Sequence, residues 1–175
     1  MSRERETGVA GLYCVESGQP IRLVVGSMTL SNGIGWSPDW TLMYFIDSTT
    51  QQLDVFDFDL TAGTLANRRQ LAKIDDHDGM PDGLAVDAEG GIWVCLFRGG
   101  AIRRYEPDGA LSAVIPLPVT DPTCPAFGGP ELRTLYVTTA RHMLSRDEQE
   151  REPLAGMVLS FEPGVAGMPA QPFAG

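Results

Sequence analysis

The 175-residue sequence has few cysteines, no long apolar run and only two histidines. Its three cysteines, Cys14, Cys95 and Cys124, are odd in number and widely spaced, so we expect reduced thiols that pack in the interior. No stretch reaches the roughly 18 apolar residues that a membrane-spanning helix needs. The charged N-terminus lacks the apolar core of a signal peptide. These absences predict a cytoplasmic location.

Basic residues are also scarce. Lys and Arg total 13 against 23 Asp and Glu, which gives a formal net charge of −10. Proteins that bind nucleic acid carry basic patches, and anionic membrane surfaces repel an acidic protein. The sequence also has no phosphate-binding P-loop and no dinucleotide fingerprint. We therefore expect neither nucleic acid nor a membrane as a partner.

What the sequence does contain is a repeat. Three segments, 31–59, 81–107 and 123–163, each follow the order strand, tight polar turn, strand, loop, strand. They begin near Asn32, Asp82 and Thr123, at intervals of 50 and 41 residues. Twenty glycines, thirteen prolines and the lack of a helical period favour short strands. A period of 40–50 residues is typical of β-propeller blades, so we predict an all-β propeller.

The repeat starts partway through a unit. The pattern of a third strand occurs a fourth time at 11–16, with no first and second strand before it. We expect residues 1–175 to form a partial propeller domain of about three and a half blades, truncated at its N-terminus, with 1–8 flexible. Since closed propellers have four to eight blades, such an arc would self-associate or pair with a missing N-terminal half. The alternative is a compact β fold of three sheets.

The motifs at 31–39 (SNGIGWSPD), 81–94 (PDGLAVDAEGGIWV) and 127–141 resemble the SMP-30/gluconolactonase/luciferin-regenerating-enzyme family. The resemblance covers nearly the whole chain from about Gly8 and matches the C-terminal portion of that family. It implies a six-bladed β-propeller with a divalent cation on the central axis. It also implies a lactonase or related hydrolase activity, with calcium binding in some members.

Carried over motif by motif, the resemblance implies Asn32 and Asp82 as metal ligands. A further Glu ligand, an Arg and an Asn of the family have no counterpart here. Amide and carboxylate oxygens suit Ca²⁺, which we expect, with Zn²⁺, Mn²⁺ or Mg²⁺ as alternatives. From the residues alone, turns are favoured over metal ligation for the Asn-Gly and Asp-Gly pairs.

The implied reaction is the opening of a sugar lactone, with the small-molecule lactone as substrate and Asp82 as general base. Two alternatives remain: a non-catalytic calcium-binding regulatory propeller, and an inactive fragment that offers only an interaction surface. The acidic segment 75–79 fails the EF-hand spacing and is expected to be a solvated loop. His77 and His142 lack a nucleophile partner and are expected to be surface or packing residues. Cys124 falls near the third channel position, where packing in the core is favoured and a place in the pocket lining is the alternative.

Overall fold

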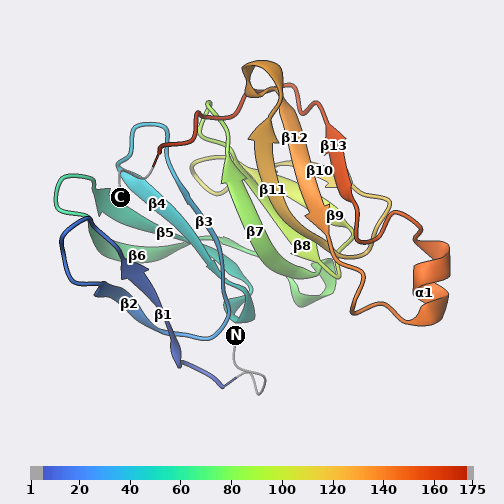
Figure 1. Ribbon diagram of the computed structural model, residues 1–175, viewed down its shortest axis with the longest axis horizontal. Helices are drawn as coiled ribbons and strands as arrows, with labels where there is room; N and C mark the ends of the chain where they lie inside the picture. Colours follow the sequence, from blue (N-terminus) through green and yellow to red (C-terminus); the bar gives the residue numbers. More distant parts are fainter. Residues whose placement is uncertain (1–5, 173–175) are drawn as a thin grey trace.

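A computed structural model describes residues 6–172, which contain thirteen strands in four antiparallel sheets (Figure 1). Residues 1–5 of the segment expected to be flexible lie outside this range. The first sheet pairs β1 (Ala10–Cys14) with β2 (Arg22–Met28). The second holds β3 (Ser31–Trp36), β4 (Leu42–Asp47), β5 (Gln52–Asp59) and β6 (Thr64–Lys73). The third holds β7 (Met80–Val86), β8 (Ile92–Phe97), β9 (Ala101–Tyr105) and β10 (Leu111–Pro116). The fourth holds β11 (Pro122–Gly128), β12 (Thr134–Thr139) and β13 (Val158–Phe161).

Helical structure is confined to short segments. The described residues contain three 3₁₀ turns, η1 (Ser48–Thr50), η2 (Asp76–Asp78) and η3 (Pro130–Leu132). The one α-helix within residues 6–172 is α1 (Arg146–Arg151), which begins with a capping box between Ser145 and Glu148. In this range no helix has the length and apolar character needed to cross a membrane. The prediction of an all-β fold is confirmed.

The core forms where neighbouring sheets pack face to face, and β8 shows why. Its alternate residues point to opposite sides of the third sheet. Val94 and Leu96 pack with the second sheet, against residues such as Tyr44. Trp93 and Cys95 pack with the fourth sheet. A strand that is buried on both faces is apolar along its whole length, as the sequence of β8 is.

The outer strands β6 and β10 were not part of the predicted repeat unit, which had three strands. β6 is polar because it lies at the outer edge, and its charged side chains pair with the strand beside it. Arg68 contacts the buried Asp54 at 2.6 Å, and Arg69 contacts Asp57 at 2.7 Å. Charged residues along an edge strand also oppose edge-to-edge aggregation.

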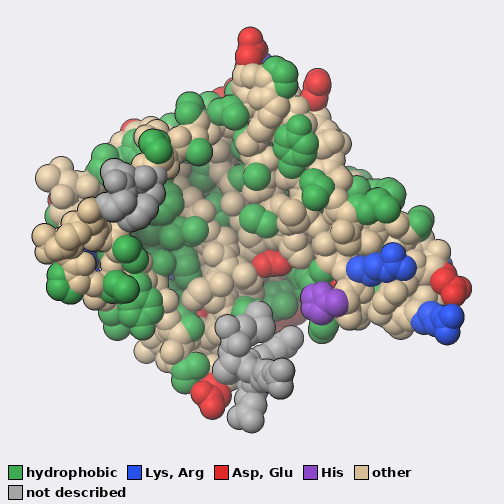
Figure 2. All heavy atoms as spheres, viewed as in Figure 1, with side chains coloured by type: hydrophobic (Ala, Val, Ile, Leu, Met, Phe, Trp, Pro, Cys, Tyr) green, Lys and Arg blue, Asp and Glu red, His purple; other side chains and the backbone are tan. Residues whose placement is uncertain are grey.

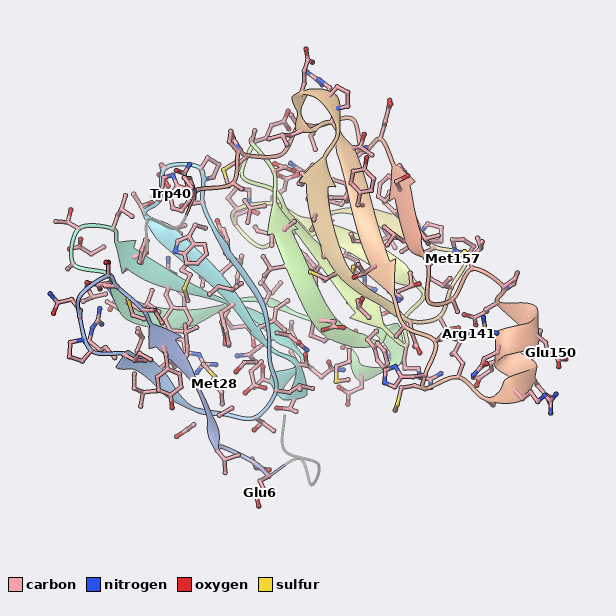
Figure 3. The ribbon with its side chains drawn as sticks, viewed as in Figure 1. Glu6, Met28, Trp40, Arg141, Glu150 and Met157 are labelled. Atoms are coloured by element: carbon pink, nitrogen blue, oxygen red, sulfur yellow. The ribbon has the colours of Figure 1, made fainter. Side chains whose placement is uncertain are left out.

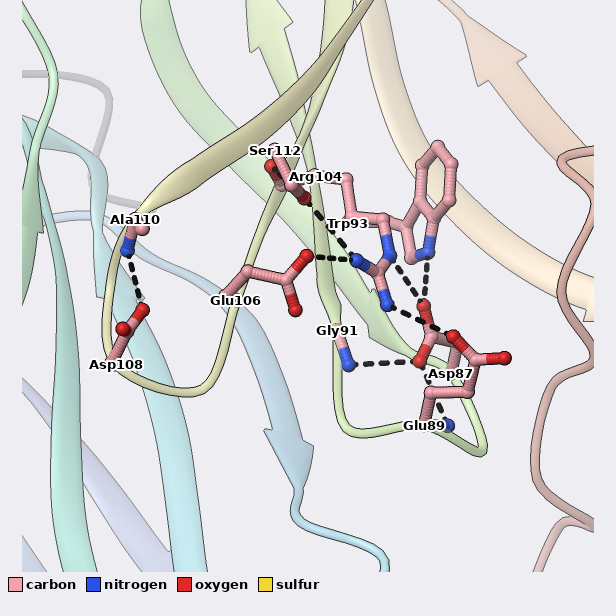
Figure 4. A network of polar contacts seen from close by, with 9 residues as sticks. All are labelled: Asp87, Glu89, Gly91, Trp93, Arg104, Glu106, Asp108, Ala110 and Ser112. Carbon is pink, nitrogen blue, oxygen red and sulfur yellow. Dashed lines mark hydrogen bonds and ion pairs between the residues drawn. The ribbon is translucent and has the colours of Figure 1, made fainter.

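A buried ionic network holds the turn between β7 and β8 (Figure 4). The carboxylate of Asp87 has no exposed area. It accepts hydrogen bonds from the Gly91 N–H at 2.8 Å, the Trp93 indole at 2.9 Å and Arg104 Nε at 2.8 Å. Because each carboxylate oxygen is paired, burial of this charge is compensated. Asp87 is therefore a structural residue of the blade.

The C-terminal segment after β13 passes over one end of the third and fourth sheets (Figure 1). The Ala88 N–H donates to the Ala166 carbonyl at 2.8 Å, and the Gly167 N–H donates to the Leu132 carbonyl at 2.8 Å. Met168 packs on the core between the second and third sheets. This segment ties the third and fourth sheets together at the end remote from Asn32 and Asp82.

Candidate metal and substrate site

The innermost strands β3, β7 and β11 lie unusually close together because glycine follows each candidate ligand. A Cβ on Gly33 would lie 2.9 Å from the Asp82 carbonyl oxygen. A Cβ on Gly83 would lie 2.7 Å from the Cys124 Cα. Real Cβ atoms do not approach other atoms so closely, so only glycine fits at either position. The Asn-Gly and Asp-Gly pairs are thus strand residues, and their interpretation as turns is wrong.

A β-bulge occurs at the same place in β3 and β7. Ser31 pairs with Asp47 and Ile34 with Phe45, so Asn32 and Gly33 together oppose the single residue Ile46. A bulge of this kind bends the strand and re-aims the side chain that it carries.

The third sheet repeats the arrangement. Pro81 pairs with Leu96 and Leu84 with Val94, which leaves Asp82 and Gly83 opposite Cys95. In β11, register is likewise shifted by one residue at Thr123. Asn32, Asp82 and Thr123 therefore occupy matching positions on three adjacent strands.

All three side chains line one cavity of about 370 Å³. That volume lies in the range of roughly 300–1,000 Å³ found for small-molecule sites. The fourth polar residue of its lining is His142, and the rest of the lining is apolar, including Met80, Phe97 and Met143. A few polar groups that converge in an apolar cavity are typical of a binding site.

Asn32 is oriented by its neighbours. Its Nδ2 donates a hydrogen bond of 2.6 Å to Ser48 Oγ, and Ser48 is fully buried. The Ser48 N–H in turn donates to the Leu30 carbonyl at 3.0 Å. Because the amide nitrogen is engaged in this way, the carbonyl oxygen of Asn32 is the atom left to accept from a ligand or bind a cation.

Asp47 fixes the start of β3. Its carboxylate accepts the N–H groups of Thr29 and Leu30 at 2.8 and 2.9 Å. Burial acts to raise the pKa of Asp47, but these hydrogen bonds outweigh it and hold the pKa below its ordinary value. The ionised carboxylate therefore belongs to the folded state and supports the strand that carries Asn32.

Asp82 has a different environment. No group within residues 6–172 donates a hydrogen bond to its carboxylate, and burial raises its pKa to about 6. A half-buried carboxylate without a donor is unfavourable when ionised, and a bound cation would compensate for that cost. With the free oxygen of Asn32 beside it, the donor set consists of hard oxygens and fits a divalent cation.

Comparison with known proteins identifies the family. Residues 1–141 match the family model described as the SMP-30/Gluconolactonase/LRE-like region. The chain belongs to this family. Regucalcin of Oryctolagus cuniculus is 36% identical over 98% of the chain and 58% of its own length.

Two solved structures of relatives agree with this assignment. A protein of Agrobacterium tumefaciens, described as a calcium-binding regucalcin, has 33% identity and a TM-score of 0.89 over 96% of this chain and 57% of its own. A gluconolactonase of Xanthomonas campestris has 27% identity and a TM-score of 0.62 over 73% of this chain and 41% of its own. The chain thus spans 58% and 57% of the length of the two regucalcins and 41% of the length of the gluconolactonase.

The acidic segment 75–79 and Cys124 are not part of the cavity lining. Asp75 and His77 are exposed, and their ligating atoms lie within 4.8 Å of one another and of Asp78. Asp78 is also paired with Arg103 at 2.9 Å. The prediction of a solvated loop is confirmed. All three cysteines are free thiols, but Cys124 is exposed where β11 passes Gly83, so its expected packing in the core is wrong.

The sequence analysis assigned no site role to two of the lining residues, Thr123 and His142. Thr123 follows Pro122 as Asp82 follows Pro81, and this shared Pro-X step could have revealed it. The sequence around His142 does not indicate a site, because His142 lies in the long connection between β12 and β13, which has no counterpart in the other two repeats. Its position in the cavity is a property of the folded chain alone.

Proposed function

We propose that this chain carries part of the active site of a divalent-metal-dependent lactonase that hydrolyses sugar lactones. The observation that carries the proposal is the Asp82 carboxylate. It is held by a bulge in a small cavity, lacks a hydrogen-bond donor and lies beside the oriented amide of Asn32. The name gluconolactonase borne by the Xanthomonas relative supports the reaction class.

Asn32 and Asp82 are the proposed metal ligands, through the amide oxygen and the carboxylate. Ca²⁺ is the expected ion, with Zn²⁺, Mn²⁺ and Mg²⁺ as alternatives, and the calcium-binding description of the Agrobacterium relative supports this order. Two protein oxygens with one negative charge are few for calcium, which takes six to eight oxygens, so we expect weak affinity. When bound, the ion supplies polarisation of the lactone carbonyl.

Asp82 is also the proposed general base. In the metal-free protein, burial raises the pKa of Asp82 to about 6, so this carboxylate is largely ionised at neutral pH and more basic than an ordinary aspartate. It can therefore accept a proton from the attacking water as the carbonyl carbon becomes tetrahedral. The apolar lining from Met80, Phe97 and Met143 limits competing water around the reacting ester.

The complete ring is a further part of this proposal. We infer that the chain supplies about three and a half blades of a six-bladed propeller, and that a second copy or a missing N-terminal half supplies the rest. The support is an exposed apolar flank on the β1–β2 sheet, where Tyr13 is 57% and Leu23 is 54% exposed. Hydrophobic side chains gather over this part of the molecule in Figure 2.

A non-catalytic calcium-binding regulator is the second candidate. Its support is the calcium-binding description of the Agrobacterium relative, together with the presence of a single carboxylate in the cavity. An inactive fragment that offers only an interaction surface is the third.

Hydrolysis of glucono-δ-lactone in a pH-stat separates these candidates. The purified chain is assayed with EDTA and then with each divalent ion, beside Asp82→Asn and the control Asp76→Asn in the exposed η2 turn. Metal-dependent turnover that only Asp82→Asn loses supports the lactonase. Calcium binding by calorimetry without turnover supports the regulator, and absence of both supports the inactive fragment.

A further inference from the structure

The segment after β12 carries a tight turn that faces the cavity. The Leu144 N–H donates to the Arg141 carbonyl at 3.1 Å, which places His142 and Met143 at the corner of the turn. Both corner residues are exposed and both line the cavity that holds Asp82. Figure 3 shows Arg141 on the segment between β12 and α1, and Glu150 on α1.

The turn is fixed from several sides although its corner is exposed. Leu144 is buried and packs with Val119 and Ala155. Gln149 of α1 donates to the Leu144 carbonyl at 2.9 Å and accepts from Arg141 Nε at 3.2 Å. The turn is therefore docked to α1 and to the core on its inner side.

Arg98 is a further residue that holds the turn. Its Nη2 donates to the Met143 carbonyl at 2.7 Å, and its guanidinium lies 3.5 Å from both Asp121 and Glu148. Asp121 is fully buried, and its backbone carbonyl accepts the Ala140 N–H at 2.8 Å. An ordinary surface turn does not need this many hydrogen bonds and ion pairs. Together they fix the position of the corner of the turn.

The polar residues in the cavity lining differ in whether they can accept or donate a proton. Asp82 is the one carboxylate and His142 the one imidazole in its lining, and they come from β7 and from the turn after β12. Neither Asn32 nor Thr123 can donate a proton as an acid. Ring opening of a lactone needs two proton transfers, because the departing ring oxygen is an alkoxide as basic as hydroxide unless it is protonated as it leaves.

We propose that His142 is a catalytic residue that protonates this leaving oxygen, an inference that rests on the proposed lactonase function. Water adds its oxygen to the carbonyl carbon, and Asp82 accepts one of the water protons. The ring C–O bond then breaks, its electron pair goes to the ring oxygen, and that oxygen takes a proton from the His142 imidazolium. The product is the hydroxy acid, and transfer of the proton from Asp82 through solvent to His142 restores both groups.

The experiment compares two lactones that differ in their leaving group. Opening of δ-valerolactone releases an alkoxide, whereas opening of 3,4-dihydrocoumarin releases a phenolate, whose conjugate acid has a pKa of about 10 like that of tyrosine and needs no acid. The purified 175-residue protein is compared with His142→Gln and with the control His77→Gln, which changes the exposed histidine outside the cavity lining. Melting temperatures verify that each variant is folded.

We expect His142→Gln to lower kcat/KM for δ-valerolactone by about 100-fold or more, the range of general acid catalysis, and to change the dihydrocoumarin value by less than about 5-fold. Added imidazole should restore part of the δ-valerolactone rate in His142→Ala. His77→Gln should leave both rates unchanged. An equal loss on both lactones, or no loss on either, overturns the role of His142 while the lactonase function stands. Failure of the unmodified protein to open either lactone with any divalent ion overturns the proposed function itself, and the role of His142 with it.

Discussion

Asn32 Nδ2 lies 2.6 Å from Ser48 Oγ, so a buried hydroxyl in the turn after β4 determines which atom of the Asn32 amide faces the cavity. Without that hydroxyl, the amide could rotate and present its nitrogen, which repels a cation. Partners that orient a ligand in this way typically contribute 10–100-fold to metal affinity. The Asn32–Ser48 pair is therefore part of the proposed metal site even though Ser48 does not line the cavity.

We predict that Ser48→Ala weakens calcium binding by about tenfold, measured by calorimetric titration. The control is Ser31→Ala, an exposed serine one residue before Asn32 in the same strand. Equal calcium affinities for the two variants would show that Ser48 does not orient the ligand.

The close approach of β7 to β11 gives a second prediction. A Cβ on Gly83 would meet both the backbone and the thiol of Cys124, at 2.7 and 2.6 Å. Gly83→Ala must push the two inner strands apart, and overpacking of this kind costs about 1–3 kcal/mol. Urea unfolding should show a loss in this range.

Gly26→Ala is the matched control for this change. A Cβ on Gly26 would meet only a Leu23 methyl at 3.7 Å, which is an ordinary contact. A Gly83→Ala variant as stable as Gly26→Ala would mean that the inner strands move apart without cost.

Asp82 should lower the stability of the metal-free fold. Burial raises its pKa to about 6, above the value of about 3.9 in an unfolded chain. The folded state therefore binds the proton more tightly, and the stability contributed by this proton is full below the unfolded pKa and is lost as the pH rises through 6. At pH 8 Asp82 is ionised in the folded state, and burial of this charge lowers the free energy of unfolding.

We predict that Asp82→Asn raises the free energy of unfolding in EDTA at pH 8 by about 1–2 kcal/mol, after allowance for screening of the partly exposed carboxylate. The gain should shrink towards pH 5, where Asp82 itself is mostly protonated. Chemical unfolding at the two pH values measures this difference. A gain that is the same at both values would contradict the assigned cause.

The sequence was sufficient for the fold class and for two of the polar positions in the cavity, because both depend on the repeat. Strand alternation and the matched Asn-Gly and Asp-Gly steps are local patterns, and they placed Asn32 and Asp82 on neighbouring inner strands. The polar outer strand β6 was not predicted from the sequence. Its charged side chains pair with Asp54 and Asp57, so its sequence lacks the alternation of polar and apolar residues that indicates a strand.

His142 could not be predicted for a different reason. Its position depends on Arg98, which lies 44 residues earlier in the chain, and on the burial of Leu144. Long-range contacts of this kind have no signature in the sequence near the histidine.

Arg98 is the residue on which the order of this turn should depend most. It is the charge partner of Asp121, which is fully buried and whose carboxylate oxygens accept no hydrogen bond from the described side chains. Burial raises the pKa of Asp121, and attraction to Arg98 opposes that rise. Removing Arg98 leaves a buried charge without its partner, at a cost of about 2 kcal/mol or more.

We predict that Arg98→Gln lowers the free energy of unfolding by about 2 kcal/mol at pH 7 and by less at pH 4.5, where Asp121 can take up a proton instead. Because the glutamine can no longer tie the Met143 carbonyl to the buried acid, amide hydrogen exchange in 141–144 should become faster, whereas exchange in β8 should keep its rate relative to global unfolding. Arg133→Gln is the control, since Arg133 is an exposed arginine paired only with the equally exposed Glu131. If Arg98→Gln destabilises the protein no more than Arg133→Gln does, Asp121 is compensated by some other group, and the turn that carries His142 is held by Leu144 and Gln149 alone.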